Sequence, residues 1–357
     1  MRSLALFSCA LVASVAGCST PETIPPVLSF SPVTDDAYVA FGTLFSVSED
    51  EVYWIGRRGS DHLSDGELVK ISHDLATGST SQPVSIIRDA DYDLRGGAHG
   101  LVGDKVLNFS TRYTHATGPA VDFSFWSSTD GLTGEAYGPS SIFVDTTDNY
   151  TRFNFYNRVV PGAAPGEYWI SRYERVADFS AIRLQLFHTL DDGGTWDALD
   201  VYAGDENLVE GTMLDLGEGK LLVVARHTHE NALTQTFSED GGNTWSTPVA
   251  TDLCSGGGNC MADLCEHEDG SFSLVYADRG DGLLKISRGN RFESIAGAVP
   301  EWQPAVVVAS PTPDTSGRTI LGYPSMLCLG ENDFLIASSV ESSPTRADLM
   351  IGRGRIP

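Results

Sequence analysis

Short hydrophobic runs rich in Val, Ile, Phe, Leu and Tyr follow one another along the chain, separated by Gly, Asp, Asn and Ser. Short runs bounded by turn residues are typical of β-strands. No stretch has the apolar spacing of an amphipathic helix of normal length. The pattern therefore predicts an all-β fold.

The strand-like runs recur at regular intervals. Five of them end in a hydroxyl residue: Ser72, Ser128, Thr189, Ser238 and Ser287. The intervals are 56, 61, 49 and 49 residues, and a similar run, 349–352, ends 65 residues beyond Ser287. Multi-stranded repeats of about 40 to 50 residues indicate a β-propeller, whose blades bury their faces only against one another. We therefore predict one six-bladed β-propeller over residues 27–357, with a strand from residues 27–50 completing the last blade.

Two of the runs lead into the same motif, Ser/Thr-x-Asp-x-Gly-x-Thr-Trp, at residues 189–196 and 238–245. We expect its Asp to accept hydrogen bonds from turn amides, its Gly to adopt a positive φ and its Trp to bury apolar surface. The motif resembles the Asp box of sialidase-type β-propellers. It predicts turns, not catalytic groups.

The N-terminus predicts export. Met1-Arg2 precedes an apolar run that is too short to span a bilayer and ends in Val15-Ala16-Gly17-Cys18. This looks like a bacterial lipoprotein signal, which implies removal of residues 1–17, lipidation of Cys18 and a polar tether over 18–26. We therefore expect a lipid-anchored protein of the bacterial cell envelope, in the outer membrane; the alternative is a simple secreted protein.

Four cysteines remain in the mature chain: Cys254, Cys260, Cys265 and Cys328. An exported protein lies where disulfides persist, so we expect one or two bridges among three possible pairings. Cys254 and Cys260 flank a short Gly-rich loop and are a candidate pair. No metal site is expected, because the usual Cys-x-x-Cys spacing of zinc sites is absent.

The chain is acidic, with 23 Lys and Arg against 48 Asp and Glu and a net charge of −25. This charge argues against a nucleic-acid partner. An anionic substrate would require a local basic site, so clustered arginines become candidates for substrate binding. We expect a monomer.

The strongest candidate stretch runs from Glu210 to Arg226 and resembles the sialidase hairpin in which a Glu precedes an Arg. The resemblance implies that Arg226 binds a substrate carboxylate through paired hydrogen bonds. It also implies that Tyr323, in Gly322-Tyr323-Pro324-Ser325, is a nucleophile that Glu210 activates. A phenol needs such a base because its pKa is near 10. The alternatives are ordinary hairpin charges and a packing tyrosine.

The sialidase resemblance also assigns roles to other residues, from their positions relative to the strands and motifs. Arg279 precedes a strand where a further carboxylate-binding Arg is expected, and Arg57 and His62 fit an Arg-x-Gly-x-x-His stretch of a bacterial sialidase-like group. The proton donor of a sialidase is normally an Asp in a loop of the first blade. Asp61 is the nearest match, with Asp65 and His62 as rivals.

A second-blade segment, Asp93-Leu94-Arg95, resembles an Asp-x-Arg-Asp-Pro stretch, although Gly96-Gly97 replaces Asp-Pro. Arg95 and His99 are therefore candidate substrate-binding residues. His99 and His115 also allow another reading, because propeller-type polysaccharide lyases use histidines to remove a proton beside a uronate carboxylate. Their flanking motifs are absent here.

These observations predict a retaining exo-sialidase-like glycosidase that releases a terminal acidic sugar from an oligosaccharide or polysaccharide and needs no cofactor. Arg57, Arg226 and Arg279 are expected to hold the carboxylate. One alternative is a lyase acting on an acidic, uronate-containing glycan, with or without sulfate groups. Another is a glycan-binding propeller without activity, because the fold alone implies none.

Overall fold

The computed structural model describes residues 29–33, 37–61, 66–89, 92–114, 118–128, 137–140, 150–176, 182–204, 207–228, 232–254, 260–289, 300–310, 320–343 and 345–356. The predicted signal, Cys18, the tether, His62, Asp65 and His115 lie outside these residues. Within these ranges the secondary structure is all-β, as predicted. No helix suited to crossing a membrane occurs in this part of the chain.

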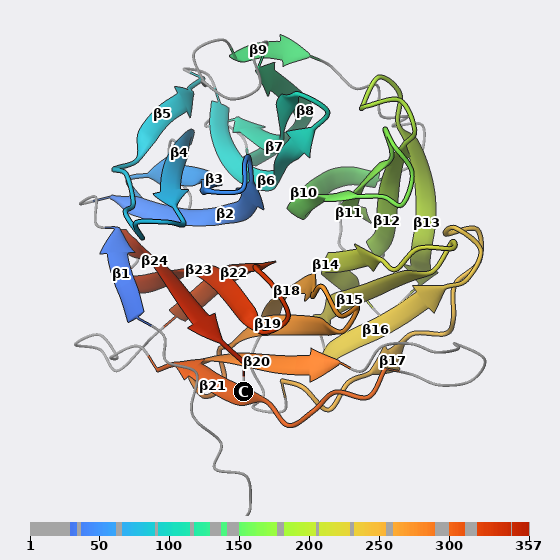
Figure 1. The fold of residues 1–357 in the computed structure, drawn as a ribbon. Coiled ribbons are helices and arrows are strands. Elements are labelled where there is room, and N and C mark those ends of the chain that lie inside the picture. The colour runs from blue at the N-terminus through green and yellow to red at the C-terminus, as the bar shows by residue number, and fades with distance from the viewer. Residues whose placement is uncertain are drawn as a thin grey trace, which may run out of the picture.

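The strands pair antiparallel in units of four that follow one another along the chain (Figure 1). Early in the chain these strands are β2 (Tyr38–Ser46), β3 (Glu51–Gly59), β4 (Gly66–Asp74) and β5 (Val84–Ile87); β6 (Tyr92–Val102), β7 (Lys105–Thr114), β8 (Gly118–Ser128) and β9 (Tyr137–Ser140); and β10 (Tyr150–Pro161), β11 (Tyr168–Val176), β12 (Ile182–Thr189) and β13 (Asp197–Gly204).

The later units continue this order. They contain β14 (Leu208–Asp215), β15 (Leu221–His227), β16 (Leu233–Ser238) and β17 (Val249–Ala250); β18 (Cys260–Glu266), β19 (Phe272–Asp278), β20 (Leu283–Gly289) and β21 (Val306–Ala309); and β22 (Ile320–Cys328), β23 (Asp333–Ser343) and β24 (Arg346–Arg355). The last unit gains its fourth strand from β1 (Ser29–Val33), which pairs antiparallel with β24. A strand from the predicted N-terminal region therefore completes it.

The hydroxyl residues that marked the repeat all lie on the third strand of a unit. Ser72 lies on β4, Ser128 on β8, Thr189 on β12, Ser238 on β16 and Ser287 on β20. The spacing in the sequence thus reports the real repeat of the strands.

Neighbouring units bury their hydrophobic faces against each other. One cluster joins Leu184 and Leu186 on β12 to Val223 on β15, and the main clusters around the molecule each combine residues of two adjacent units in the same way. A cluster around Trp54 on β3 also contains Leu349 on β24, so the first and last units share a core. Each unit therefore buries its hydrophobic faces against its neighbours.

The two motif turns have matching hydrogen bonds. Asp240 Oδ1 accepts hydrogen bonds from the backbone N–H of Thr244 and from the Ser238 hydroxyl, both at 2.8 Å. Gly242 has φ +85°, and Trp245 packs at the edge of a core cluster. The turn at 189–196 repeats this arrangement, with Asp191 as acceptor. The expected turn chemistry is confirmed at both places.

A buried carboxylate connects the first strands of several units. Asp263 on β18 is fully buried; its Oδ1 lies 3.1 Å from Arg158 Nη2 on β10 and accepts a hydrogen bond from Thr212 Oγ1 on β14, also at 3.1 Å. Its Oδ2 accepts a hydrogen bond from the backbone N–H of Met326 on β22 at 2.7 Å. A buried charge is tolerated only when it is paired and hydrogen-bonded, so these strands depend on one another.

Asn157 and Arg158 extend this network. The Asn157 side chain donates to Asp263, and its backbone carbonyl accepts a hydrogen bond from Thr43 on β2. Arg158 Nη1 donates to the backbone carbonyl of Met326 at 2.6 Å. Strands from most units therefore meet at one buried polar cluster, called the Asp263 cluster below.

Replacing Asp263 with Asn should destabilise the fold strongly. The change preserves shape but removes one acceptor and leaves the Arg158 guanidinium without its anion. We expect the free energy of unfolding, measured with denaturant, to fall by about 3–5 kcal/mol.

Asp269→Asn provides the matched control, because Asp269 is exposed and forms an ion pair with Arg288 at 2.8 Å. Its loss should stay below about 1 kcal/mol. Equal small losses in the two variants would contradict the structural role given to Asp263.

Candidate active site

Bulges interrupt the first strands of several units and direct side chains toward one cavity. The pairing register shifts in β2, β6, β10, β14 and β22. Inside four of these shifts a residue other than glycine adopts a positive φ: Phe41 (57°), Asn157 (71°), Glu210 (52°) and Tyr323 (42°). Such backbone costs about 1–3 kcal/mol per residue and is concentrated at functional sites. Bulges commonly re-aim side chains in this way.

The bulge of β6 uses glycine instead. A Cβ atom on Gly96 would overlap with the backbone carbonyl of Phe41, and one on Gly97 would overlap with that of Phe109. Glycine therefore allows β2 and β6 to approach closely at the edge of the cavity.

The cavity has a volume of about 350 Å³. Its lining combines aromatic, amide and charged side chains with exposed backbone: Phe41, Gly42, Thr43, Arg95, Gly96, Gly97, Asn154, Phe155, Tyr156, Asn157, Tyr173, Arg175, Glu210, Arg226, Arg279, Tyr323 and Pro324. Asn157 belongs to both the lining and the Asp263 cluster. The cavity therefore adjoins the Asp263 cluster and shares Asn157 with it.

Tyr323 and Glu210 meet in this cavity although they lie far apart in the sequence. The Tyr323 hydroxyl donates a hydrogen bond to Glu210 Oε1 at 3.1 Å, and Arg226 Nη1 lies 2.8 Å from Glu210 Oε2. Burial and the Glu210 carboxylate raise the pKa of Tyr323 well above its usual value, despite the opposing effect of Arg279 and Arg226. The phenol is therefore neutral and has a carboxylate ready to accept its proton.

Arg279 lies beside the same tyrosine. It follows β19 and donates through Nε to the backbone carbonyl of Leu321 at 2.8 Å. Its Nη2 is 3.8 Å from the position that a Cβ on Gly322 would occupy, next to Tyr323. Arg226 and Arg279 thus place two guanidinium groups beside the Tyr323–Glu210 pair in one cavity, an arrangement suited to an anionic substrate.

Comparison with known proteins supports the architecture. No family model and no curated protein matches the chain. Among solved structures, a protein of unknown function from Dyadobacter fermentans aligns with TM-score 0.72 and 17% identity over 94% of this chain and 99% of that one. The intramolecular trans-sialidase from Ruminococcus gnavus aligns with TM-score 0.68 and 14% identity, covering 89% and 94% of the two chains.

A Hadza microbial sialidase aligns with TM-score 0.69 and 13% identity over 89% of this chain. The chain has a sialidase-like fold. The alignment spans 66% of the length of that sialidase. At these identities the likeness concerns the fold alone.

Within this sialidase-like fold, Arg57 lies outside the cavity lining. It is fully buried on β3, with Nη2 3.0 Å from Asp93 Oδ1. Asp93 Oδ2 in turn accepts a hydrogen bond from Arg95 Nε at 3.0 Å, and Arg95 does line the cavity. Arg57 therefore supports Arg95 through a shared carboxylate. The backbone carbonyl of Asp61 accepts a hydrogen bond from Arg57 Nη1 at 2.7 Å, and the Asp61 side chain also lies outside the lining.

His99 also lies outside the lining and is completely buried on β6. Its Nδ1 is 3.0 Å from Asn108 Oδ1, and its Nε2 accepts a hydrogen bond from the backbone N–H of Gly97 at 3.4 Å. Burial lowers the pKa of His99 to about 3. This neutral imidazole, with both nitrogens engaged, holds the glycine bulge in place.

Several lining residues were not identified from the sequence. Asn154, Asn157, Tyr173 and Arg175 all come from β10 and β11. A signal was present, because polar residues interrupt the apolar runs Phe153–Val160 and Tyr168–Tyr173. The direction of the Asn157 side chain depends on the bulge of β10, which the sequence pattern does not reveal.

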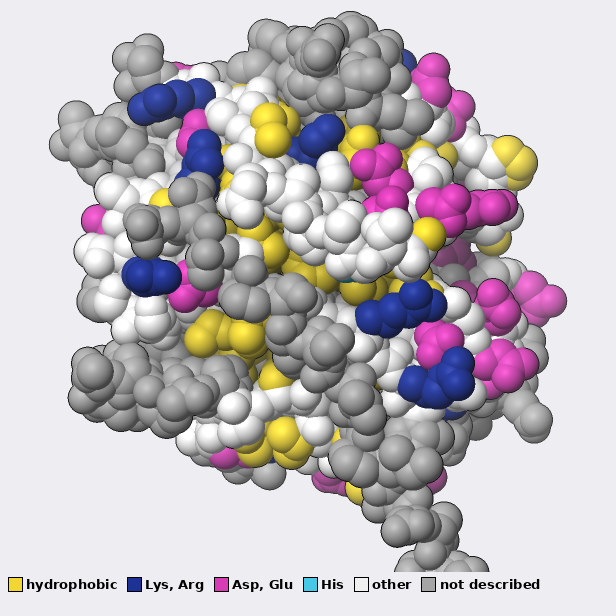
Figure 2. All heavy atoms as spheres, turned by 60° about the vertical axis from the view of Figure 1, so that its left-hand side comes forward, with side chains coloured by type: hydrophobic (Ala, Val, Ile, Leu, Met, Phe, Trp, Pro, Cys, Tyr) yellow, Lys and Arg dark blue, Asp and Glu magenta, His cyan; other side chains and the backbone are white. Residues whose placement is uncertain are grey.

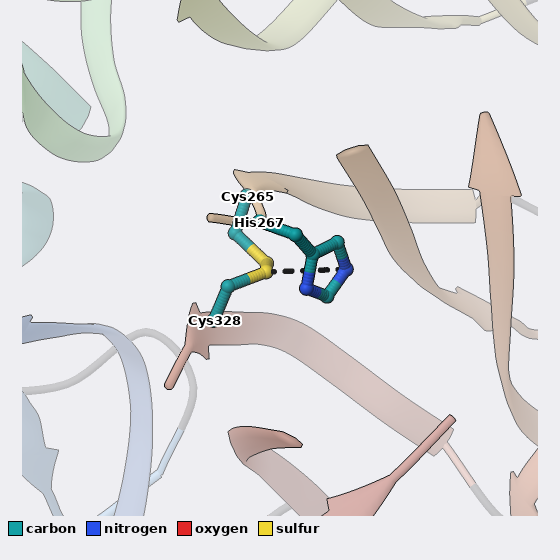
Figure 3. A group of neighbouring side chains, drawn as sticks. All are labelled: Cys265, His267 and Cys328. Carbon is teal, nitrogen blue, oxygen red and sulfur yellow. Dashed lines mark hydrogen bonds between the residues drawn. A yellow bond between two sulfur atoms is a disulfide. The ribbon is translucent and has the colours of Figure 1, made fainter. Parts of the chain in front are cut away.

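Among the described residues, two groups of side chains have the spacing of metal ligands, and both are already bridged by disulfides. Cys265 and Cys328 form one bridge, with His267 Nε2 3.5 Å from Cys328 Sγ (Figure 3). Cys254 and Cys260 form the other, beside Asp278. Metals bind thiolates, which a disulfide does not offer. Both groups therefore serve here as covalent links, and the first joins β18 to β22.

His99→Gln should change the pH dependence of stability. The folded protein keeps His99 neutral, whereas the unfolded chain takes up a proton below its usual pKa of 6.5. The contribution of His99 to stability is therefore fully present above that pH and is lost as the pH falls toward 3. Between pH 7 and about pH 5, His99 should account for a fall of about 2 kcal/mol in the free energy of unfolding.

Denaturant unfolding at several pH values measures this effect. The variant should lack the His99 contribution to the slope, while the contributions of His73 and His267 remain in both proteins. Identical slopes would show that His99 is not held neutral by the fold.

Proposed function

We propose that this chain is a retaining sialidase-like glycosidase built on a six-bladed β-propeller, and that it releases a terminal acidic sugar from a glycan. The observation that carries the proposal is the hydrogen bond from the Tyr323 hydroxyl to Glu210, beside Arg226, within one cavity. The order of the units and the core shared by the first and last of them support a closed ring of blades.

In this mechanism Tyr323 Oη attacks the anomeric carbon while its proton passes to Glu210. The bond to the leaving oxygen breaks, and that oxygen takes a proton from Asp61, a role assigned from family resemblance alone because the Asp61 side chain lies outside the described cavity lining. Water then attacks the anomeric carbon of the tyrosyl intermediate, gives a proton to Asp61, and Tyr323 recovers its proton from Glu210. Arg226 and Arg279 hold the sugar carboxylate throughout.

A neutral nucleophile suits this substrate. An anionic nucleophile would be repelled by the sugar carboxylate, whereas the phenol approaches without charge and transfers its proton as the bond forms. The raised pKa of Tyr323 keeps the phenol neutral before attack. The hydrolase is favoured over a lyase that uses His99, because both nitrogens of that buried imidazole already have partners.

Tyr323→Phe should abolish release of free sialic acid from a fluorogenic sialoside, lowering kcat by about 10³-fold or more because the nucleophile is lost. Tyr276→Phe is the matched control, since Tyr276 lies in a core cluster of β19 and should leave turnover unchanged. Turnover that survives in Tyr323→Phe would overturn the mechanism. An unsaturated uronate product would indicate the lyase, and binding without any product would indicate a glycan-binding protein.

Asp61→Asn tests the proposed proton donor through the leaving group. Departure of a sugar alcohol needs a proton, whereas an acidic aryl leaving group departs without one. Loss of Asp61 should therefore slow cleavage of a sialyl disaccharide by about 10²–10⁴-fold and that of an activated aryl sialoside much less. Equal losses on both substrates would remove Asp61 from this role.

A further inference from the structure

The disulfide between Cys265 and Cys328 has a histidine beside it. Cys265 lies near the end of β18, and His267 is two residues further along the chain, so both side chains point to the same side of the extended backbone (Figure 3). The sulfur of each cysteine and one ring nitrogen of His267 all lie within 4.8 Å of one another. Two cysteines and a histidine are a ligand set that suits zinc.

Hydrogen bonds fix the orientation of the His267 ring. Its Nδ1 lies 3.1 Å from the backbone carbonyl of Gly330, which can only accept, so Nδ1 donates. Nε2 of the neutral ring is then an acceptor, and it lies 3.5 Å from Cys328 Sγ. Histidines that bind metals are usually held in this way, by an N–H that donates to a carbonyl. The imidazole therefore already has the tautomer and the direction of a metal ligand.

A neighbouring contact keeps the two cysteines close when their bridge is open. Asp263 lies two residues before Cys265, and Met326 lies two residues before Cys328. The backbone N–H of Met326 donates to Asp263 Oδ2 at 2.7 Å, so β18 and β22 are joined next to the bridge by a contact that reduction does not remove. The two thiols therefore stay within reach of one metal ion.

The same bridge is open to small molecules. Both of its cysteines line a cavity of about 510 Å³, which shares no described lining residue with the candidate active site. Cys328 is partly exposed, whereas Cys254 and Cys260 of the other disulfide are only 2% and 1% exposed. Thiol–disulfide exchange requires access to a sulfur atom, so we expect a dithiol to reduce the Cys265–Cys328 bridge first.

The other disulfide offers a poorer ligand set. The third group beside Cys254 and Cys260 is the Asp278 carboxylate, whose Oδ2 lies 2.9 Å from Lys285 Nζ. This ammonium group already neutralises the carboxylate and would repel a metal ion. The Cys254–Cys260 bridge therefore provides an internal comparison within the same protein.

We propose that the Cys265–Cys328 bridge is a redox-gated metal site: a dithiol first reduces the disulfide, and the two thiolates and His267 Nε2 then bind one zinc ion. Three protein ligands leave the fourth position of zinc to water. The metal then links β18 to β22 in place of the covalent bond. The site is separate from the glycosidase chemistry proposed above.

The exchange balances in electrons and protons. One thiolate of the dithiol attacks Cys328 Sγ, and the bond between the two cysteine sulfurs breaks. The second thiolate attacks the resulting mixed disulfide, which leaves two cysteine thiols and an oxidised dithiol. Each thiol loses its proton as zinc binds. The Ser273 hydroxyl, which donates to His267 Nε2 at 2.7 Å, is displaced by the metal.

Surface carboxylates are the competing sites for zinc. The chain has a net charge of −25, and Figure 2 shows Asp and Glu side chains (magenta) gathered toward one side of one face of the molecule. These groups are the same in the oxidised and the reduced protein. Only a difference in bound zinc between the two forms therefore reports the proposed site.

Zinc content after gel filtration tests the site, in protein reduced by a phosphine under native conditions. The reduced parent protein should retain about one zinc ion per chain more than the oxidised protein. Cys328→Ser and His267→Gln should each lower this difference by about tenfold or more, because each removes a ligand. The double variant Cys254→Ser, Cys260→Ser should keep it. Ser273→Ala should tighten zinc binding by about threefold or more, because the competing hydroxyl is gone.

Alkylation of the reduced parent protein gives a second measurement that needs no variant. Zinc should slow the modification of Cys265 and Cys328 by about tenfold or more and leave Cys254 and Cys260 unaffected, as mapped by mass spectrometry of the peptides. Equal zinc content in the oxidised and reduced protein, free thiols that zinc does not protect, or a bridge that stays closed in the phosphine would each overturn the proposal. Weaker zinc binding by Ser273→Ala would contradict the assignment of Nε2 as the ligand.

Discussion

The buried carboxylate of Asp263 is the constraint on which the architecture depends. It contacts Arg158, Thr212 and Met326, so strands from four units must meet within hydrogen-bond distance of a single side chain. Hydrophobic packing between units allows some adjustment, but a desolvated charge does not, because its cost is large when any partner is missing. The Asp263 cluster therefore constrains how these four strands meet.

The same constraint positions residues of the cavity. Asn157 contributes to the Asp263 cluster and to the cavity lining, and the neighbouring bulges hold Glu210 and Tyr323 at positive φ. The energetic cost of this backbone is sustained because the surrounding strands are fixed by the core and by the buried polar contacts. Positioning of the tyrosine and its base is thus a consequence of how the units meet.

The repeat of the strands could be predicted from the sequence, because Ser72, Thr189 and Ser238 mark a period that hydrophobic packing imposes on every unit. The Tyr323–Glu210 pair could be proposed only from family resemblance, and its contact depends on distant strands. The positions of Arg57 and His99 could not be predicted. A charged or titratable residue in a short motif has the same sequence pattern whether its side chain faces a cavity or lies behind the cavity wall. Here both side chains lie behind the wall, where Arg57 contacts Asp93 and His99 contacts Asn108.

The central claim is that Tyr323 forms a covalent bond to the substrate. Incubation with a sialic acid that carries fluorine at the anomeric carbon and at the adjacent carbon slows breakdown of such an intermediate, and mass spectrometry of the digested protein then locates it. The account predicts a sugar adduct on the peptide that contains Tyr323, absent from Tyr323→Phe. An adduct on another residue, or rapid hydrolysis of sialosides with no adduct, would contradict it.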